Sequence, residues 1–275
     1  ETAEEILLSS YVCHPSLCND NLTGPSMLTF LAKYLSQFNL RYSYRFLFIP
    51  ETIGAITWLC LNENKLSHIK GGLVATCLGD SGDLTYKKSR SGDAIIDKIV
   101  EKVLIDTTKP YKIRDFYPSG SDERQFSSPG FALPIGSLMR TPYAHYAEYH
   151  TSADDLNFVK DEYLADSFAR YLDVVFVLEN NFSYINLCPK GEPQLGRRGL
   201  YKMIGGNKNN NINELAMAWI LNFSDGQHSL LDIAIKANLS FREIKKAIDA
   251  LLSVGLLERC SMRKHQKVSQ CCYVV

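Results

Sequence analysis

A histidine and an aspartate, His14 and Asp20, follow the first apolar run of this 275-residue chain. The run, residues 6–12, has the character of a buried strand, and Pro15 ends its sheet pairing because proline has no N–H to donate. Asp20 lies in an Asn-Asp-Asn turn, a sequence whose side chains bond their own backbone. Open α/β sheets bind ligands beyond the carboxyl ends of their strands, and zinc accepts an imidazole and a carboxylate there. The alternative is a turn with a surface histidine and a capping aspartate.

Three further polar segments follow this loop along the chain. Ile-Pro-Glu-Thr-Ile-Gly begins at residue 49, Gly-Ser-Asp-Glu-Arg-Gln-Phe at residue 120, and Glu-Tyr-His-Thr-Ser-Ala-Asp at residue 148. With the first loop, they resemble in order the metal loop, base segment, substrate loop and last metal-ligand motif of zinc aminopeptidases of the aminopeptidase-Y type. The resemblance covers about residues 4–180. Residues 212–260 resemble the C-terminal winged helix of an aminopeptidase-like branch.

The resemblance assigns metal ligands to His14, Asp20 and His150, with Asp20 in the position of the bridging carboxylate. His150 also lies in a long coil segment, where a packed core histidine is less expected. These three side chains with a water molecule would complete a tetrahedral zinc site, to which Asp80 is a further candidate ligand.

One position departs from the family pattern, and it bears on the number of metal ions. The family has two consecutive glutamates, a base and then a ligand, and Thr52 stands in the second place. A hydroxyl binds zinc poorly, so we expect one zinc ion and not a second. Asp80 best matches the family's remaining carboxylate ligand, and Asp83 competes with it. Glu148 is a third candidate, because it stands two positions before His150 and would face the same side of an extended segment.

Glu51 follows Pro50 at the end of an expected strand, where the resemblance places the general base. A carboxylate there can take the proton of a zinc-bound water, whose pKa the metal lowers to ~7. The alternative is an acid at a helix N-terminus, which the helix dipole favours. Asp122 and Arg124 lie in the loop that the family uses near its substrate. Arg124 would pair there with a substrate carboxylate or form a salt bridge within the loop.

Composition favours a cytoplasmic globular enzyme. Hydrophobic residues make up 45% and charged residues 22% of the chain, and no apolar run reaches the ~20 residues that span a bilayer. The eight cysteines follow no disulfide framework, so we expect free thiols. Cys13 and Cys18 flank His14, but no second pair follows at zinc-finger spacing, and we expect both to be buried thiols. The chain starts without Met almost directly on a strand, so we also expect a missing upstream portion.

Strands and helices alternate along the first two thirds of the chain, which predicts an α/β fold with a mostly parallel sheet covered by helices. Strands are expected at 6–12, 41–49, 72–77 and 133–138, and helices at 26–37, 53–62, 93–104 and 164–178. A winged helix is expected from helices at 213–221, 229–237 and 241–254 and strands at 256–260 and 268–275. The predicted bounds are 1–188 for the zinc-hydrolase domain, 189–211 for a Gly-, Pro- and Asn-rich linker, and 212–275 for the winged helix.

The net charge is zero but unevenly distributed. Residues 1–194 carry 18 Lys and Arg against 24 Asp and Glu, whereas residues 195–275 carry 12 against 6. A basic tail of this kind indicates either nucleic-acid contact or docking on an acidic surface. The expected recognition helix also carries Glu243 and Asp249, so we expect docking or self-association rather than DNA binding.

Together these features predict a zinc-dependent, aminopeptidase-like hydrolase that cleaves an N-terminal peptide bond or another small amide, with Glu51 as general base. The alternative is a catalytically weakened peptidase fold that senses a ligand and regulates through its winged helix, an alternative that Thr52 favours. A third possibility is an amide-forming or cyclising transferase on a related fold.

Overall fold

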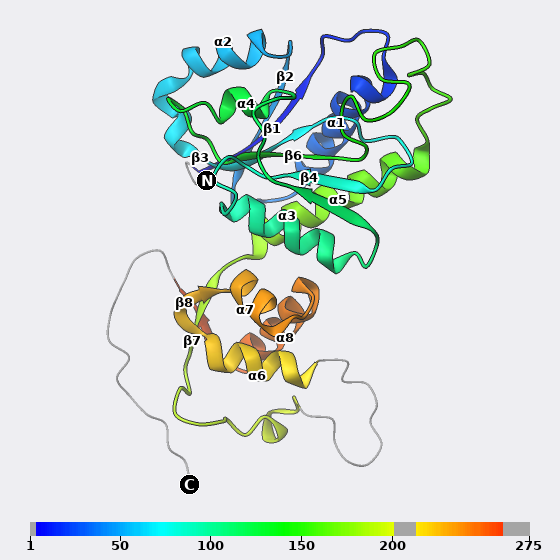
Figure 1. Cartoon of the computed structure of the whole chain (residues 1–275). Helices are drawn as coiled ribbons and strands as arrows, with labels where there is room; N and C mark the ends of the chain where they lie inside the picture. The colour runs from blue at the N-terminus through cyan, green and yellow to red at the C-terminus, as the bar shows by residue number, and fades with distance from the viewer. Residues whose placement is uncertain (1–3, 201–212, 261–275) are drawn as a thin grey trace. The chain divides into compact units, whose positions relative to one another are not determined.

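The computed structural model describes residues 4–200 and 213–260 (Figure 1). The chain divides into two compact units, residues 1–179 and 180–275, which we describe separately. Within the described ranges, no helix is both long and apolar enough to cross a membrane.

The first unit contains a six-stranded sheet in the order β2-β1-β3-β6-β4-β5. Its strands are β1 (Glu5–Tyr11), β2 (Ser43–Ile49), β3 (Ile69–Ala75), β4 (Leu84–Lys87), β5 (Tyr111–Arg114) and β6 (Ile135–Met139). All neighbours pair in parallel except β4 and β6, which are antiparallel. The predicted mostly parallel sheet is therefore confirmed, although β4 and β5 were not predicted.

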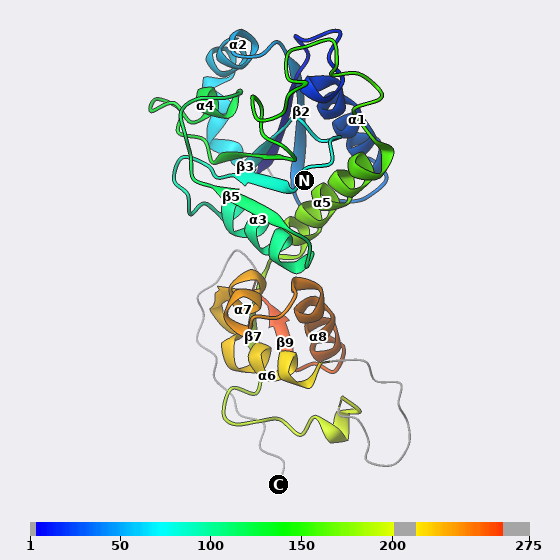
Figure 2. The same cartoon turned by 45° about the vertical axis from the view of Figure 1, so that its right-hand side comes forward.

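Helices cover both faces of this sheet (Figures 1 and 2). They are α1 (Thr23–Leu35), α2 (Ile53–Leu61), α3 (Ile95–Asp106), the one-turn α4 (Glu123–Phe126) and α5 (Asp161–Asn180). On one face, α2 and α4 bury Leu59 and Phe126 against Leu7 of β1 and Val74 of β3. On the other face, α1 begins so close to the sheet that a side chain at Gly24 would meet the carbonyl oxygen of Ala75 at 2.4 Å. The buried face of α1, with Met27, Leu28, Leu31 and Leu35, is the apolar face that its sequence predicts.

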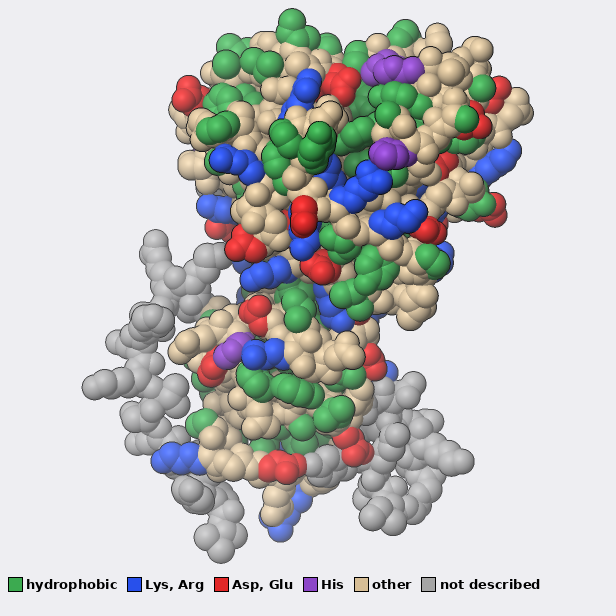
Figure 3. Space-filling view, viewed as in Figure 1, with side chains coloured by type: hydrophobic (Ala, Val, Ile, Leu, Met, Phe, Trp, Pro, Cys, Tyr) green, Lys and Arg blue, Asp and Glu red, His purple; other side chains and the backbone are tan. Residues whose placement is uncertain are grey.

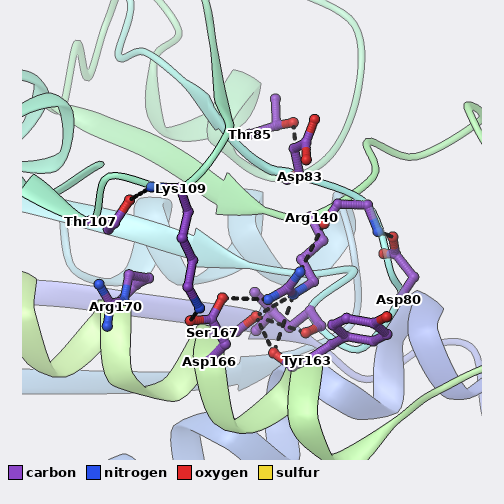
Figure 4. A network of polar contacts seen from close by, with 12 residues as sticks. Asp80, Asp83, Thr85, Thr107, Lys109, Arg140, Tyr163, Asp166, Ser167 and Arg170 are labelled. Carbon is purple, nitrogen blue, oxygen red and sulfur yellow. Dashed lines mark hydrogen bonds and ion pairs between the residues drawn. The ribbon is translucent and has the colours of Figure 1, made fainter. Parts of the chain in front are cut away.

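A buried arginine joins the end of β6 to α5 (Figure 4). Arg140 donates to Asp166 Oδ2 at 2.6 Å, to Ser167 Oγ at 3.1 Å and to the carbonyl oxygen of Gly82 at 2.8 Å. Lys109 Nζ donates to the other oxygen of Asp166 at 2.7 Å. Since Arg140 is 5% exposed, these partners offset the cost of burying its charge.

The second unit is a winged helix-turn-helix. Its helices are α6 (Glu214–Phe223), α7 (Leu230–Ala237) and α8 (Phe241–Ser253), and its antiparallel strands β7 (Ser183–Asn186), β8 (Asp225–Ser229) and β9 (Leu257–Arg259). The side chain of Ser240 accepts from the backbone of Glu243, as its capping-box sequence predicts. The predicted strand at 268–275 lies outside the described residues.

Strand β7 is the central strand of the second sheet, which has the order β8-β7-β9. It was not predicted, and it precedes the predicted linker at 189–211. The winged-helix unit therefore begins with β7, before the predicted linker, and its first helix, α6, follows that linker. The predicted domain bounds stay a prediction.

The six described cysteines that the structure places are free thiols, as expected. The prediction that Cys13 and Cys18 are buried is wrong, because Cys13 is exposed and Cys18 is only partly buried. Cys13 extends beyond the end of β1 into the loop, where the sheet no longer covers it.

Candidate metal centre

Three predicted ligands converge beyond the carboxyl ends of the parallel strands. His14 lies in the loop after β1, Asp20 in the turn before α1, and His150 in the long loop between β6 and α5. The ligand atoms of these three residues all lie within 4.8 Å of one another. His150 Nε2 lies 3.0 Å from Asp20 Oδ2. His150, which is 130 positions from Asp20 in the sequence, thus joins the other two in one compact donor set of two imidazoles and one carboxylate.

Backbone and side-chain contacts fix Asp20, whose side chain is almost completely buried. Asp154, at the end of the loop that carries His150, accepts from Asn19 N at 2.6 Å and from Asp20 N at 2.9 Å. The Tyr11 hydroxyl donates to Asp20 Oδ1. Burial raises the pKa of Tyr11 well above its ordinary value, so the phenol remains a donor at neutral pH.

Aromatic contacts fix the two imidazoles. The ring of His150 stacks on Tyr149 with 3.9 Å between centroids, and its centroid lies 5.0 Å from that of His14. The His14 ring in turn meets the edge of Tyr11 at 5.7 Å. The side chain of His150 is nevertheless 49% exposed, so the centre is open to solvent on one side.

Glu51 reaches the same centre from the neighbouring strand. β1 and β2 pair in parallel with Tyr11 opposite Ile49, so the two chains leave the sheet at the same level. The ligand atoms of Cys13, His14 and Glu51 all lie within 4.8 Å of one another. Burial raises the pKa of Glu51, and the charge of Asp20 raises it further, although hydrogen bonding to Ser121 lowers it. A carboxylate with a raised pKa beside a metal centre is suited to proton transfer.

The turn after Glu51 is held by the loop that contains Asp122 and Arg124. Thr52 has φ +60°, which is rare for a β-branched residue. Asp122 Oδ1 accepts from Thr52 N at 2.7 Å, and Arg124 Nη2 donates to Thr52 Oγ1 at 3.3 Å. Burial raises the pKa of Asp122 to about 7. Both predicted substrate-loop residues therefore lie beside the base, and their contact with substrate stays a prediction.

The remaining carboxylate candidates are not part of either donor set among the described residues. Asp80 is buried and accepts from Asn19 Nδ2 at 3.1 Å, from Gly82 N at 2.8 Å and from Thr141. These contacts support the metal loop from behind. Asp83 lies 3.6 Å from Lys112 Nζ. The geometry therefore does not show that Asp80, Asp83 or Glu148 binds the metal, and these ligand roles stay predictions.

Two residues that sequence reasoning gave no role complete the surroundings. Tyr11 ends β1 inside an apolar run, and nothing in that run marks its hydroxyl as the partner of Asp20. Asp154 is the last residue of the motif that contains His150, and this position is the one feature of the sequence that could have indicated its contact with the Asp20 loop. Both residues orient a ligand from behind, a common arrangement in metal sites.

The donor set fits zinc on chemical grounds. Catalytic zinc sites commonly hold the ion with three protein ligands drawn from histidine and carboxylate, and they leave one position open. Two histidines and one aspartate in a partly exposed loop cluster meet that description.

Comparisons with known proteins agree with the fold. A Clostridium acetobutylicum protein named for polysaccharide biosynthesis and an aminopeptidase-like domain is 59% identical over 258 residues, which are 94% of this chain and 59% of that protein. A crystal structure from C. acetobutylicum, named for a peptidase, has a TM-score of 0.87 at 56% identity, over 94% of this chain and 58% of that one. The zinc aminopeptidase BSAP from Bacillus subtilis has a TM-score of 0.56 at 13% identity, over 65% and 47%, and shows the fold alone.

The chain thus spans 59% of the length of the curated relative that it matches. Residues 182–259 match the model of a winged helix-turn-helix, which confirms the predicted C-terminal winged helix. The aminopeptidase-like fold that the resemblance implied is confirmed as well. Residues 1–181 match the model described as "Domain of unknown function (DUF4910)". The chain therefore belongs to this DUF4910 family, whose aminopeptidase-like domain is followed here by a winged helix-turn-helix.

Proposed function

We propose that the first unit is a zinc-dependent hydrolase of the aminopeptidase type, which cleaves an N-terminal peptide bond or another small amide. The observation that carries the proposal is the convergence of His14, Asp20 and His150 within 4.8 Å, with Glu51 beside His14. The aminopeptidase-like fold supports it. A cytoplasmic location and a single zinc ion are part of the proposal.

The roles of the chain's own residues follow from their positions. A zinc ion held by His14, Asp20 and His150 supplies Lewis acidity and lowers the pKa of a water molecule to ~7. The Glu51 carboxylate would take a proton from the attacking water and return it to the leaving amine. Tyr11 keeps the Asp20 carboxylate oriented throughout.

Buried polar atoms without a hydrogen-bond partner in the described part of the chain lie near Glu51, and they favour a substrate that has a polar group at this position. Asp122 Oδ2 and Arg124 Nε are buried and have no hydrogen-bond partner among the described residues. Buried polar groups are nearly always paired, so both atoms are available to a ligand. We assign substrate contacts to Asp122 and Arg124, and to Glu148 because it closely precedes His150 in the same loop.

Metal analysis and turnover of matched variants test this function. The wild type should bind about one equivalent of zinc, and His14→Ala or His150→Ala should abolish binding. Glu51→Gln should keep the zinc but lower turnover by at least ~10²-fold, because proton transfer contributes that much. Aminoacyl amides form the substrate panel, with N-acylated amino sugars added because the relative is named for polysaccharide biosynthesis. A folded wild type that takes up no zinc at neutral pH would contradict the proposal.

We propose docking or self-association for the winged helix, with DNA binding as the weaker alternative. The exposed face of α8 combines Arg242 and Lys246 with Glu243, and Lys245 is paired with Asp249 at 2.5 Å. Basic and acidic side chains are also interspersed on the face that Figure 3 shows. Such a surface attracts phosphates weakly. Sequence-selective, nanomolar binding of duplex DNA by the whole chain at physiological salt would reverse this assignment.

A further inference from the structure

Cys13 is an exposed thiol at the edge of the metal centre. It directly precedes His14, and its Sγ lies 3.6 Å from His14 Nδ1. The parallel register of β1 and β2, with Tyr11 opposite Ile49, continues two residues further to place Cys13 level with Glu51. A hydrogen bond from Val12 N to the carbonyl oxygen of Ile49, at 3.1 Å, extends the pairing beyond the strands. The thiol therefore faces the proposed base because the strand pairing positions both.

This arrangement forms a second donor set of thiol, imidazole and carboxylate. The ligand atoms of Cys13, His14 and Glu51 all lie within 4.8 Å of one another, as close as those of the first set. Thiolate ligands select zinc and softer ions, whereas carboxylate ligands suit harder ones. We propose that Cys13, His14 and Glu51 form a second metal site, which takes a soft, thiophilic divalent ion such as cadmium. When the ion binds, the thiol releases its proton to solvent, and no electrons are transferred.

The two sites compete, because both use His14. A neutral imidazole binds one ion, since its second nitrogen carries a proton. An ion between Cys13 and His14 therefore removes one of the three ligands from the set with Asp20 and His150. It also occupies the Glu51 carboxylate. The second site is consequently inhibitory, a conclusion that rests on the hydrolase proposed above.

Cadmium binding tests the second site without any activity assay. A thiolate bound to Cd²⁺ gives a charge-transfer absorption in the ultraviolet, which nitrogen and oxygen ligands do not give. The Cd²⁺-loaded wild type should show this band, and Cys13→Ser should lack it. Cys18→Ser is the matched control and should keep the band, because Cys18 is partly buried in the same loop and belongs to neither donor set. A wild-type protein that binds Cd²⁺ without the band, or a band that persists in Cys13→Ser, would overturn the proposal.

Zinc uptake and cadmium inhibition separate this inference from the hydrolase proposal. Cys13→Ser should retain about one zinc equivalent in equilibrium dialysis, through His14, Asp20 and His150. Its inhibition by Cd²⁺ should weaken by ~10-fold or more, since even indirect losses around a metal cost 10–100-fold in affinity. Unchanged Cd²⁺ inhibition would overturn the inference and leave the hydrolase intact. A Cys13→Ser protein without zinc, beside a wild type with the cadmium band, would support the thiolate site and remove the hydrolase centre.

Discussion

Asp154 joins the loop of His150 to the loop of Asp20, and Asp154→Asn tests whether this link controls metal binding. The carboxylate has no exposed surface. One oxygen accepts from Asn19 N at 2.6 Å and the other from Asp20 N at 2.9 Å. An asparagine has only one acceptor oxygen, so its amide N–H₂ would face one of these backbone N–H groups.

The expected loss follows from that single contact. A hydrogen bond to a charged group contributes about 1.5–3 kcal/mol, and the variant loses one such bond next to a ligand. Because 1.4 kcal/mol is a factor of ten, the zinc dissociation constant should rise by roughly 10- to 150-fold. This agrees with the 10–100-fold effect of residues that orient metal ligands from behind.

Chelator competition measures the zinc affinity of the wild type and the variant. Asp155→Asn is the matched control, because the Asp155 carboxylate accepts from Asn157 and Phe158 within its own turn and from no residue of the Asp20 loop that the structure describes. Its zinc affinity should equal that of the wild type, and circular dichroism checks that both variants fold. A folded Asp154→Asn protein with wild-type zinc affinity would refute the reasoning, because Asp154 would then be structural only.

Two further predictions concern stability. Burial raises the pKa of Asp166, but the hydrogen bond and charge of Lys109 and the charge of Arg140 outweigh it and lower the pKa overall. The ion pair therefore stabilises the fold above the ordinary carboxyl pKa of about 4 and loses that effect as the pH falls through the lowered value. Asp166→Asn should lower the free energy of unfolding at pH 7 by about 1.5–3 kcal/mol in urea denaturation, with a smaller difference in acid. A difference that does not shrink would contradict this. For the second unit, a fragment 180–275 should unfold cooperatively, whereas 207–275 should not, because it lacks the central strand β7. Cooperative unfolding of the shorter fragment would show that β7 is dispensable.

Strands β4 and β5 were missed because neither sequence shows a pattern typical of a strand. β5 is an edge strand whose residues are mostly exposed, so it has no apolar pattern. β4 is buried along its whole length but contains Lys87. That ammonium donates to Glu123 at 2.6 Å and to the carbonyl oxygen of Ser119 at 2.8 Å. Because tertiary partners compensate the charge, local hydrophobicity cannot reveal the strand.

The site was predictable to the extent that loops following strands are predictable. His14 and Asp20 stand out because a polar turn interrupts an apolar run. His150 has no such local signal, and only the family resemblance placed it with them. The contacts of Asp80 with Asn19 and Thr141 arise from the folded loops and could not be read from the sequence, and its role as a ligand stays a prediction.

The order of the strands in the first sheet accounts for both donor sets, because β1, β2 and β6 all end at the same edge. Because β1 lies between β2 and β3, its loop meets Glu51 from β2 on one side. β6 ends at the same edge, and the loop that follows it brings His150 next to His14. His14 is therefore the only residue that belongs to both sets among the described residues, and the choice between them depends on the softness of the ion. A hard or borderline ion is held by Asp20 and His150 and leaves the base free. A thiophilic ion would bind Cys13 and Glu51 instead, so the fold geometry that brings together the proposed hydrolase centre would also allow its inhibition.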